Sequence, residues 1–157
     1  QGHSPALTGS MITVFLLGGA IGSIFGGYVG DRFGRKNCIV GSLALCVPAL
    51  YIFFASPEVG WLTWIALWVS GAGLQAPLPS SIVWAQEMLP ANAAMASGMM
   101  LGLAFGLGGI GAAITGVLAD WIGLHQALLL AIVPIAAAAV IAAMIPEAKE
   151  VPAARTA

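Results

Sequence analysis

Long uncharged runs separated by short polar segments are the dominant pattern of this 157-residue chain. The runs cover 7–30, 37–55, 61–86, 93–119 and 127–145, and none of them contains Asp, Glu, Lys, Arg or His. About 20 apolar residues are enough for an α-helix to cross the hydrocarbon layer of a membrane. The pattern therefore predicts an all-α integral membrane bundle of five transmembrane helices over 1–146 and a polar tail over 147–157.

The composition supports this interpretation. Hydrophobic residues make up 60% of the chain, charged residues 7%, and the mean hydropathy is +1.00. A soluble protein of this length would need a more charged exterior, and the chain has no basic patch that could follow a nucleic-acid backbone. It also has no nucleophile–base pair, metal cluster or phosphate-binding loop. We therefore expect no enzyme activity, catalytic residue, metal or cofactor.

The two cysteines are expected to be packing residues. Cys38 and Cys46 lie eight positions apart in one predicted helix, which corresponds to about 12 Å along its axis. A disulfide requires Cα atoms within about 7 Å, so the two cannot pair with each other.

Glycine recurs at every fourth position in the first and fourth runs. This spacing places the glycines on one face of a helix and allows a second backbone to approach closely. We expect two helix-packing faces, and a role as sliding surfaces during conformational change is secondary. Their residues are Gly18, Gly22, Gly26, Gly98, Gly102 and Gly106.

Charge distribution predicts the orientation of the chain. Five runs place the two chain ends on opposite sides of the membrane. The turn after the first run and the tail then share one side and hold all the cations, whereas the turns on the other side hold Glu58, Asp120 and His125. By the positive-inside rule the side with the cations is cytoplasmic.

A short internal repeat agrees with this topology. The segment 116–123, Gly-Val-Leu-Ala-Asp-Trp-Ile-Gly, repeats the pattern of 27–34, Gly-Tyr-Val-Gly-Asp-Arg-Phe-Gly. Both copies follow a glycine-rich run, and they are three runs apart, so they lie on opposite membrane faces. This arrangement is typical of an inverted three-helix repeat.

The turn after the first run also carries a recognisable motif. Its pattern is Gly-x-(Leu-like)-x-Asp-Arg-x-Gly-Arg-(Lys/Arg), which resembles the signature loop of the major facilitator superfamily of secondary transporters. The residues that supply it are Gly27, Val29, Asp31, Arg32, Gly34, Arg35 and Lys36. The resemblance implies a twelve-helix fold in which this chain corresponds to helices 8–12 of the C-terminal half. Assignment to the N-terminal half is the alternative, and the polar tail favours the C-terminal one.

Within the superfamily, the segments 85–90 and 96–111 resemble the fosmidomycin-resistance type of drug exporter. This resemblance implies a secondary active transporter in a bacterial-type inner membrane that exports a small organic compound or drug by alternating access, coupled to protons. The implied partners are the lipid bilayer, the missing N-terminal half of the same polypeptide, the substrate and protons. One alternative is a symporter or uniporter for a sugar or an organic anion, and another is a truncated bundle that only packs against a partner.

The resemblance also suggests roles for particular residues. Asp31 is the candidate conformational latch, with its carboxylate near Arg35 and near the N-terminus of the fourth run, around Ala93 to Ser97. The alternative is that Asp31 and its cations only fix the topology. Glu87, at a cytoplasmic helix end, is a candidate gate residue or a solvated charge rather than a proton carrier.

A candidate substrate path lies in the third run. Pro77 and Pro79 interrupt this run beside Gln75, its only mid-span amide, and broken helices often mark binding sites in transporters. Gln75 could instead satisfy the backbone groups that the prolines leave unpaired. The sequence does not decide between these two roles. Asp120 and His125 are expected to be solvated turn residues.

Overall fold

The computed structural model describes residues 5–56 and 59–145, and every secondary-structure element within them is a helix. The all-α class expected from the sequence is therefore confirmed. The helices are α1 (Pro5–Phe33), α2 (Arg35–Ala55), α3 (Trp61–Gln75), α4 (Pro77–Met88), the 3₁₀ turn η1 (Pro90–Asn92), α5 (Ala93–Ile122), α6 (Leu124–Leu130) and α7 (Ile132–Met144). The predicted tail over 147–157, with Lys149 and Arg155, lies outside the described residues.

Four helical segments are long and apolar enough to cross a membrane: Pro5–Phe33, Arg35–Ala55, Pro90–Ile122 and Leu124–Met144. The third run of the sequence is instead divided into α3 and α4, which meet at Ala76. Proline has no backbone N–H, so Pro77 cannot bond to the carbonyl four residues before it and begins a new helix. Ala76 keeps helical dihedral angles and its bond to Ala72 O at 3.0 Å, so the chain continues across the break.

The last run is divided in a similar way. α6 ends at Leu130 and α7 begins at Ile132, because Pro134 cannot donate a hydrogen bond to the Leu130 carbonyl. Ala131 between them remains in the right-handed helical region.

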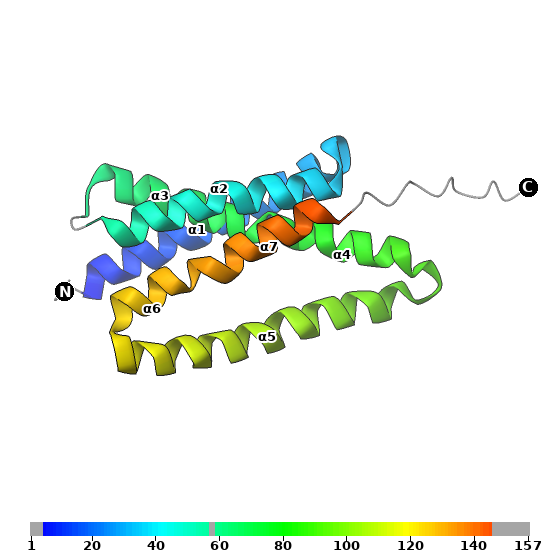
Figure 1. Ribbon diagram of the computed structural model, residues 1–157. Coiled ribbons are helices and arrows are strands. Elements are labelled where there is room, and N and C mark those ends of the chain that lie inside the picture. The colour runs from blue at the N-terminus through cyan, green and yellow to red at the C-terminus, as the bar shows by residue number, and fades with distance from the viewer. Residues whose placement is uncertain (1–4, 57–58, 146–157) are drawn as a thin grey trace, which may run out of the picture.

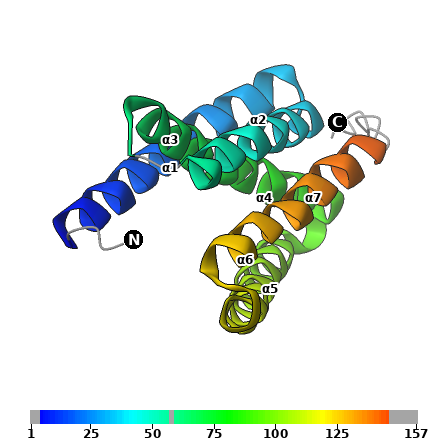
Figure 2. The same ribbon diagram turned by 60° about the vertical axis from the view of Figure 1, so that its left-hand side comes forward.

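Within the described residues, α5 is connected to the other helices through α4 and α6. α1 and α2 both pack on α3, and α7 lies along α2 (Figures 1 and 2). α4 contacts α1, α2 and α5, whereas the only other helix that contacts α5 within the described residues is α6, apart from the turn η1. α5 therefore lies at one edge of the bundle.

The glycine face of α1 packs closely on α3 and on the residue that follows it. A Cβ atom added at Gly18 or Gly22 would collide with the backbone of α3, at Trp68 and Ala72 respectively, and one added at Gly26 would collide with Ala76, which follows α3. All three glycines are buried. The absence of side chains at these positions therefore brings the two helix backbones into contact.

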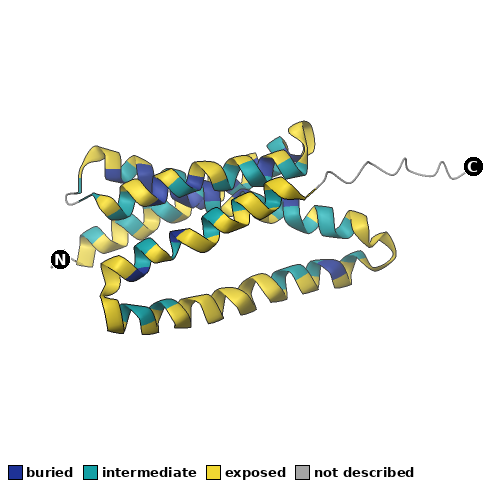
Figure 3. Ribbon diagram, viewed as in Figure 1, coloured by how far each residue is buried: buried dark blue, intermediate teal, exposed yellow. Residues whose placement is uncertain are grey.

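The corresponding face of α5 is open. Within the described residues, an added Cβ at Gly98, Gly102 or Gly106 would find no atom within 4 Å. Most positions of α5 are exposed, and Ala96 is its one buried residue (Figure 3). The packing role of these three glycines stays a prediction.

Candidate functional site

The turn between α1 and α2 is built around Gly34. Its backbone angles, φ 91° and ψ 136°, lie in a region that residues with a side chain rarely adopt. Because this one residue reverses the chain, Asp31 and Arg32 at the end of α1 lie close in space to Arg35 and Lys36 at the start of α2. Gly34 therefore sets the geometry of the whole charged turn.

Arg35 connects this turn to α4. Its Nη2 lies 2.8 Å from Oε1 of Glu87 and 3.7 Å from Oδ1 of Asp31. The Arg35 side chain is 20% exposed, against 56% for Glu87 and 72% for Asp31. Arg35 occupies the first turn of α2, where the helix dipole disfavours a cation. The carboxylate of Glu87 offsets that effect, whereas Asp31 stays largely in contact with solvent.

The expected approach of Asp31 to the start of α5 is not observed. α1 packs on α2, α3 and α4 but does not contact α5. The N-terminal turn of α5 instead contacts the end of α4: Gln86 Nε2 donates to Ser97 Oγ at 2.7 Å, and Ser97 Oγ donates to Ala93 O at 2.9 Å.

Neighbouring residues at the end of α4 thus have different partners. Glu87 pairs with α2, and Gln86 binds α5 across the turn η1. Gln86 and Ser97 were not candidate site residues in the sequence, because a glutamine and a serine near helix ends give no signal of their own.

The other two cations of the turn do not join this network. Arg32 donates from Nη1 to the Tyr28 hydroxyl at 2.8 Å, and its guanidinium lies 6.0 Å from the centroid of the Phe33 ring. Lys36 forms no salt bridge within the described residues. The ion pairs of the turn therefore converge on Arg35.

Buried hydrogen bonds hold the helices together beside the charged turn. The carbonyl of Gly26 accepts from Cys38 Sγ at 3.2 Å and from Ser80 Oγ at 3.1 Å. These donors come from α2 and α4, so three helices meet at one backbone oxygen. Their effect is to fix the two helices that carry Arg35 and Glu87 relative to each other and to α1.

Gln75 lies at the end of α3 and is exposed. Its side chain lies along α1 beside Gly19, where an added Cβ would be 2.9 Å from its Cγ. The amide makes no hydrogen bond within the part of the chain that the structure describes. It therefore does not satisfy the carbonyls left unpaired by Pro77 and Pro79 in this conformation.

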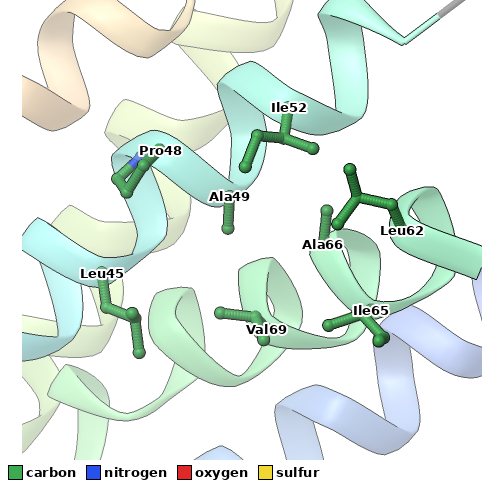
Figure 4. A pocket seen from close by; sticks show the side chains of 8 residues that line it. All are labelled: Leu45, Pro48, Ala49, Ile52, Leu62, Ile65, Ala66 and Val69. Atoms are coloured by element: carbon green, nitrogen blue, oxygen red, sulfur yellow. The ribbon is translucent and has the colours of Figure 1, made fainter.

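An apolar groove of about 200 Å³ lies between α2 and α3 (Figure 4). Leu45, Pro48 and Ile52 line it from α2, and Ile65 and Val69 line it from α3. No side chain in the lining can form a hydrogen bond, so the groove offers no means to orient a polar substrate. Over residues 5–56 and 59–145, no group of three or more His, Cys, Asp or Glu residues could hold a metal ion.

Comparison with known proteins identifies the family. The sequence model of the Major Facilitator Superfamily matches residues 1–157 of this chain. The chain belongs to the Major Facilitator Superfamily. No solved structure matches it significantly.

Several members of the superfamily are similar to this chain. An MFS-type transporter of Bacillus subtilis, YfnC, is 43% identical over 73% of the chain and 28% of its own length. The fosmidomycin resistance protein of Escherichia coli is 41% identical over 68% of the chain and 26% of its own length. The niacin transporter NiaP of Acinetobacter baylyi is 29% identical over 92% of the chain. The chain thus spans between a quarter and a third of the length of these relatives.

Proposed function

We propose that this chain is the C-terminal part of a secondary transporter that exports a small organic compound or drug in exchange for protons. Membership of the superfamily carries the proposal, together with three similar proteins whose names say that they are transporters. The relative named for fosmidomycin resistance favours export as the direction. The rest of the transporter is the N-terminal half of the same polypeptide.

In this proposal the charged turn lies on the cytoplasmic side of an inner membrane. The described helices support that arrangement, because the α1–α2 turn and the α4–α5 turn lie at one end of the bundle and the turn between α5 and α6 lies at the other (Figure 1). The cations of the first turn would then lie on the side that the positive-inside rule assigns to the cytoplasm.

Asp31 is the proposed conformational latch, with Glu87 in a supporting role. Arg35 is engaged mainly by Glu87 at 2.8 Å, and Asp31 remains 72% exposed. A largely exposed carboxylate at this position can bind a donor or a helix N-terminus in the other half, and such a contact is worth about 0.3–1 kcal/mol. A contact present in only one conformation shifts the populations of inward-open and outward-open states several-fold.

The proton-coupling group is proposed to lie in the other half. Ionisable residues within the membrane are the usual sites of proton relay, and none of the five runs of this chain contains one. Gln75, with Pro77 and Pro79, is the proposed contribution of this chain to the substrate path, because its amide is exposed and lacks a hydrogen-bonding partner among the described residues.

The test uses the complete polypeptide and measures export of a compound from cells, or its uptake into inverted membrane vesicles, with and without a pH gradient. Fosmidomycin is the first compound to test. We expect export that is lost when the gradient is dissipated. Export that is unaffected by the gradient would contradict proton coupling, and the absence of transport for every tested compound would contradict the transporter proposal.

A second candidate function keeps the fold but reverses the coupling. Two relatives are named a niacin transporter and a gentisate transporter, and they are 29% and 31% identical to this chain. An organic-anion or sugar symporter would take up its substrate together with protons, and a uniporter would need no gradient. A bundle that only packs against a partner would move no compound.

A further inference from the structure

Ser23, near the middle of α1, has a hydroxyl without a partner among the described residues. The other seven serines of the described chain each donate a hydrogen bond to a backbone carbonyl. Ser23 does not bond to the carbonyl of Gly19, which is the usual kind of acceptor for a serine inside a helix. Within 5–56 and 59–145, the one buried side-chain polar atom that lacks a partner belongs to Arg35. The unpaired hydroxyl of Ser23 is therefore accessible from the surface.

A second unpaired polar side chain, that of Gln75, lies on the same side of α1. An added Cβ at Gly19 would be 2.9 Å from Cγ of Gln75. Ser23 follows Gly19 by one turn, about 6 Å along the helix axis and about 40° around it. Gly19 is the central residue of the 29-residue helix α1. The two polar side chains thus lie near the depth at which transporters bind their substrates.

This side of the α1–α3 contact is turned away from α2. On α3, Gly73 faces α2, because an added Cβ there would be 2.9 Å from the Cβ of Cys46. Gln75 follows Gly73 by two positions, which is about 200° around the helix, and so points to the opposite side. Gln75 is exposed and Ser23 is half-buried. The two polar groups therefore share one accessible face of the α1–α3 pair.

The surroundings of Ser23 and Gln75 favour an uncharged ligand group. Neither of the two long runs that contain them has an ionisable side chain, and a charge buried without a counterion is costly. A hydroxyl and a primary amide can each donate and accept hydrogen bonds. Ile12 and Leu16 lie within about 20° of Ser23 around α1, and they are 55% and 59% exposed. An apolar body with one uncharged hydrogen-bonding group matches this face.

We propose that Ser23 and Gln75 form one polar subsite of the substrate path, which binds an uncharged hydrogen-bonding group of the substrate, such as an alcohol or an amide. The inference rests on the proposed transport function. It adds a second binding residue and the chemical class of the group that is bound. The substrate supplies the partner that both side chains lack in the described chain.

The first test is chemical modification of single cysteines in membranes that contain the complete polypeptide, with Cys38→Ala and Cys46→Ala as the background. The probe is a charged methanethiosulfonate reagent, because it reacts with the thiolate, which forms in contact with water rather than in apolar surroundings. We expect fast modification of Ser23→Cys. The matched control is Ile21→Cys, on the opposite side of α1, which should react about tenfold more slowly.

Equal rates at the two positions would overturn the subsite, as would a faster reaction of Ile21→Cys or no reaction at either position. If Ser23→Cys fails to accumulate, Gln75→Cys replaces it, with the half-buried neighbour Leu74→Cys as the control. The measurement does not require transport, so its result is independent of the proposed function.

The second test measures the specificity of transport by the complete polypeptide. It uses pairs of compounds that share an apolar body and carry either a hydroxyl or a methyl group. Ser23→Ala should raise the half-saturating concentration of the hydroxyl compound by roughly 2–10-fold, the effect of one lost hydrogen bond. That of the methyl compound should not change. Ser23→Thr keeps the hydroxyl and should retain the wild-type preference.

Ser70→Ala is the matched control for transport, because the Ser70 hydroxyl is buried and donates to Ala66 O at 2.6 Å. It should leave the preference between the two compounds unchanged. An unchanged preference in Ser23→Ala would overturn the inference, as would an equal change for both compounds. If the wild type transports no compound, the proposed function is contradicted, and the cysteine modification alone decides on the subsite.

Discussion

At the residue scale, Arg35 links α1, α2 and α4 at the charged turn. Its guanidinium is the most buried charged group of the network, and it pairs with Glu87 more closely than with Asp31. The motif in the sequence identifies Arg35 and Asp31 as candidates. It could not predict the pairing with Glu87, because only the packing of α2 against α4 brings those two helix ends together.

We predict a weak but measurable coupling between Arg35 and Glu87. Because Glu87 is 56% exposed, solvent screens the pair, and the coupling should be below about 1 kcal/mol. The measurement is a double-mutant cycle with Arg35→Gln and Glu87→Gln, with unfolding of the purified polypeptide in detergent as the readout. The coupling should decrease at high salt. Strictly additive effects of the two substitutions would contradict a direct interaction.

Asp31→Asn should reduce transport by the complete polypeptide several-fold, because it removes the charge of the proposed latch. Membrane insertion and stability should remain normal, since Asp31 is 72% exposed and lies 3.7 Å from Arg35. Asp120→Asn is the matched control, because Asp120 occupies the same position in the second copy and is expected to be a solvated turn residue. Equal transport by wild type and Asp31→Asn would refute the latch.

Gln75→Ala should change the relative transport of different substrates without loss of stability. The physical reason is that the amide is exposed and forms no hydrogen bond within the described residues, so its removal leaves no buried group unpaired. Transport of a panel of compounds is the measurement, and Leu74→Ala on the same helix is the control for a general packing effect. A substrate profile identical to that of wild type would remove Gln75 from the substrate path.

At the scale of the elements, glycine decides which helices approach each other. The four-residue spacing in α1 corresponds to a face that packs on α3. The same spacing in α5 gave an equally strong signal, yet that face is open in the described chain. Periodicity alone identifies a packing face but not its partner, which depends on segments elsewhere in the polypeptide.

Two glycine-to-alanine substitutions on α1 should differ in their effect on stability. At Gly22, an added Cβ collides with the backbone of Ala72, and we expect Gly22→Ala to destabilise the protein by about 1–3 kcal/mol. At Gly27, nothing lies within 4 Å of an added Cβ, so Gly27→Ala should be neutral or stabilise the helix by up to about 1 kcal/mol. Thermal unfolding in detergent compares the two variants. Unchanged stability of Gly22→Ala would contradict a direct backbone contact between α1 and α3 at this position.

Some helix ends can be predicted from the nearby residues in the sequence, and others cannot. Gly34 and the charged residues around it predict the first turn directly. The divisions at Ala76 and Ala131 are subtler, because Pro77 and Pro134 are visible in the sequence but their effect depends on the rest of the helix. Pro48 has the same chemistry, and α2 nevertheless continues through it from Arg35 to Ala55.

At the scale of the whole molecule, hydropathy predicts the class of fold and the motif predicts the family. Both are confirmed by the helical structure and the family match. The sequence of this chain cannot supply the groups that complete the substrate path and carry protons, because in our account they belong to the other half.

The central claim is exchange of a small organic compound for protons, and the most direct measurement is the internal pH of proteoliposomes that contain the complete polypeptide. A transported compound is added outside in the absence of any other gradient. Entry of the compound in exchange for protons should make the interior more alkaline, in proportion to transport and less so with Asp31→Asn. Acidification of the interior would indicate symport and contradict the account, and transport without any change in pH would indicate a uniporter.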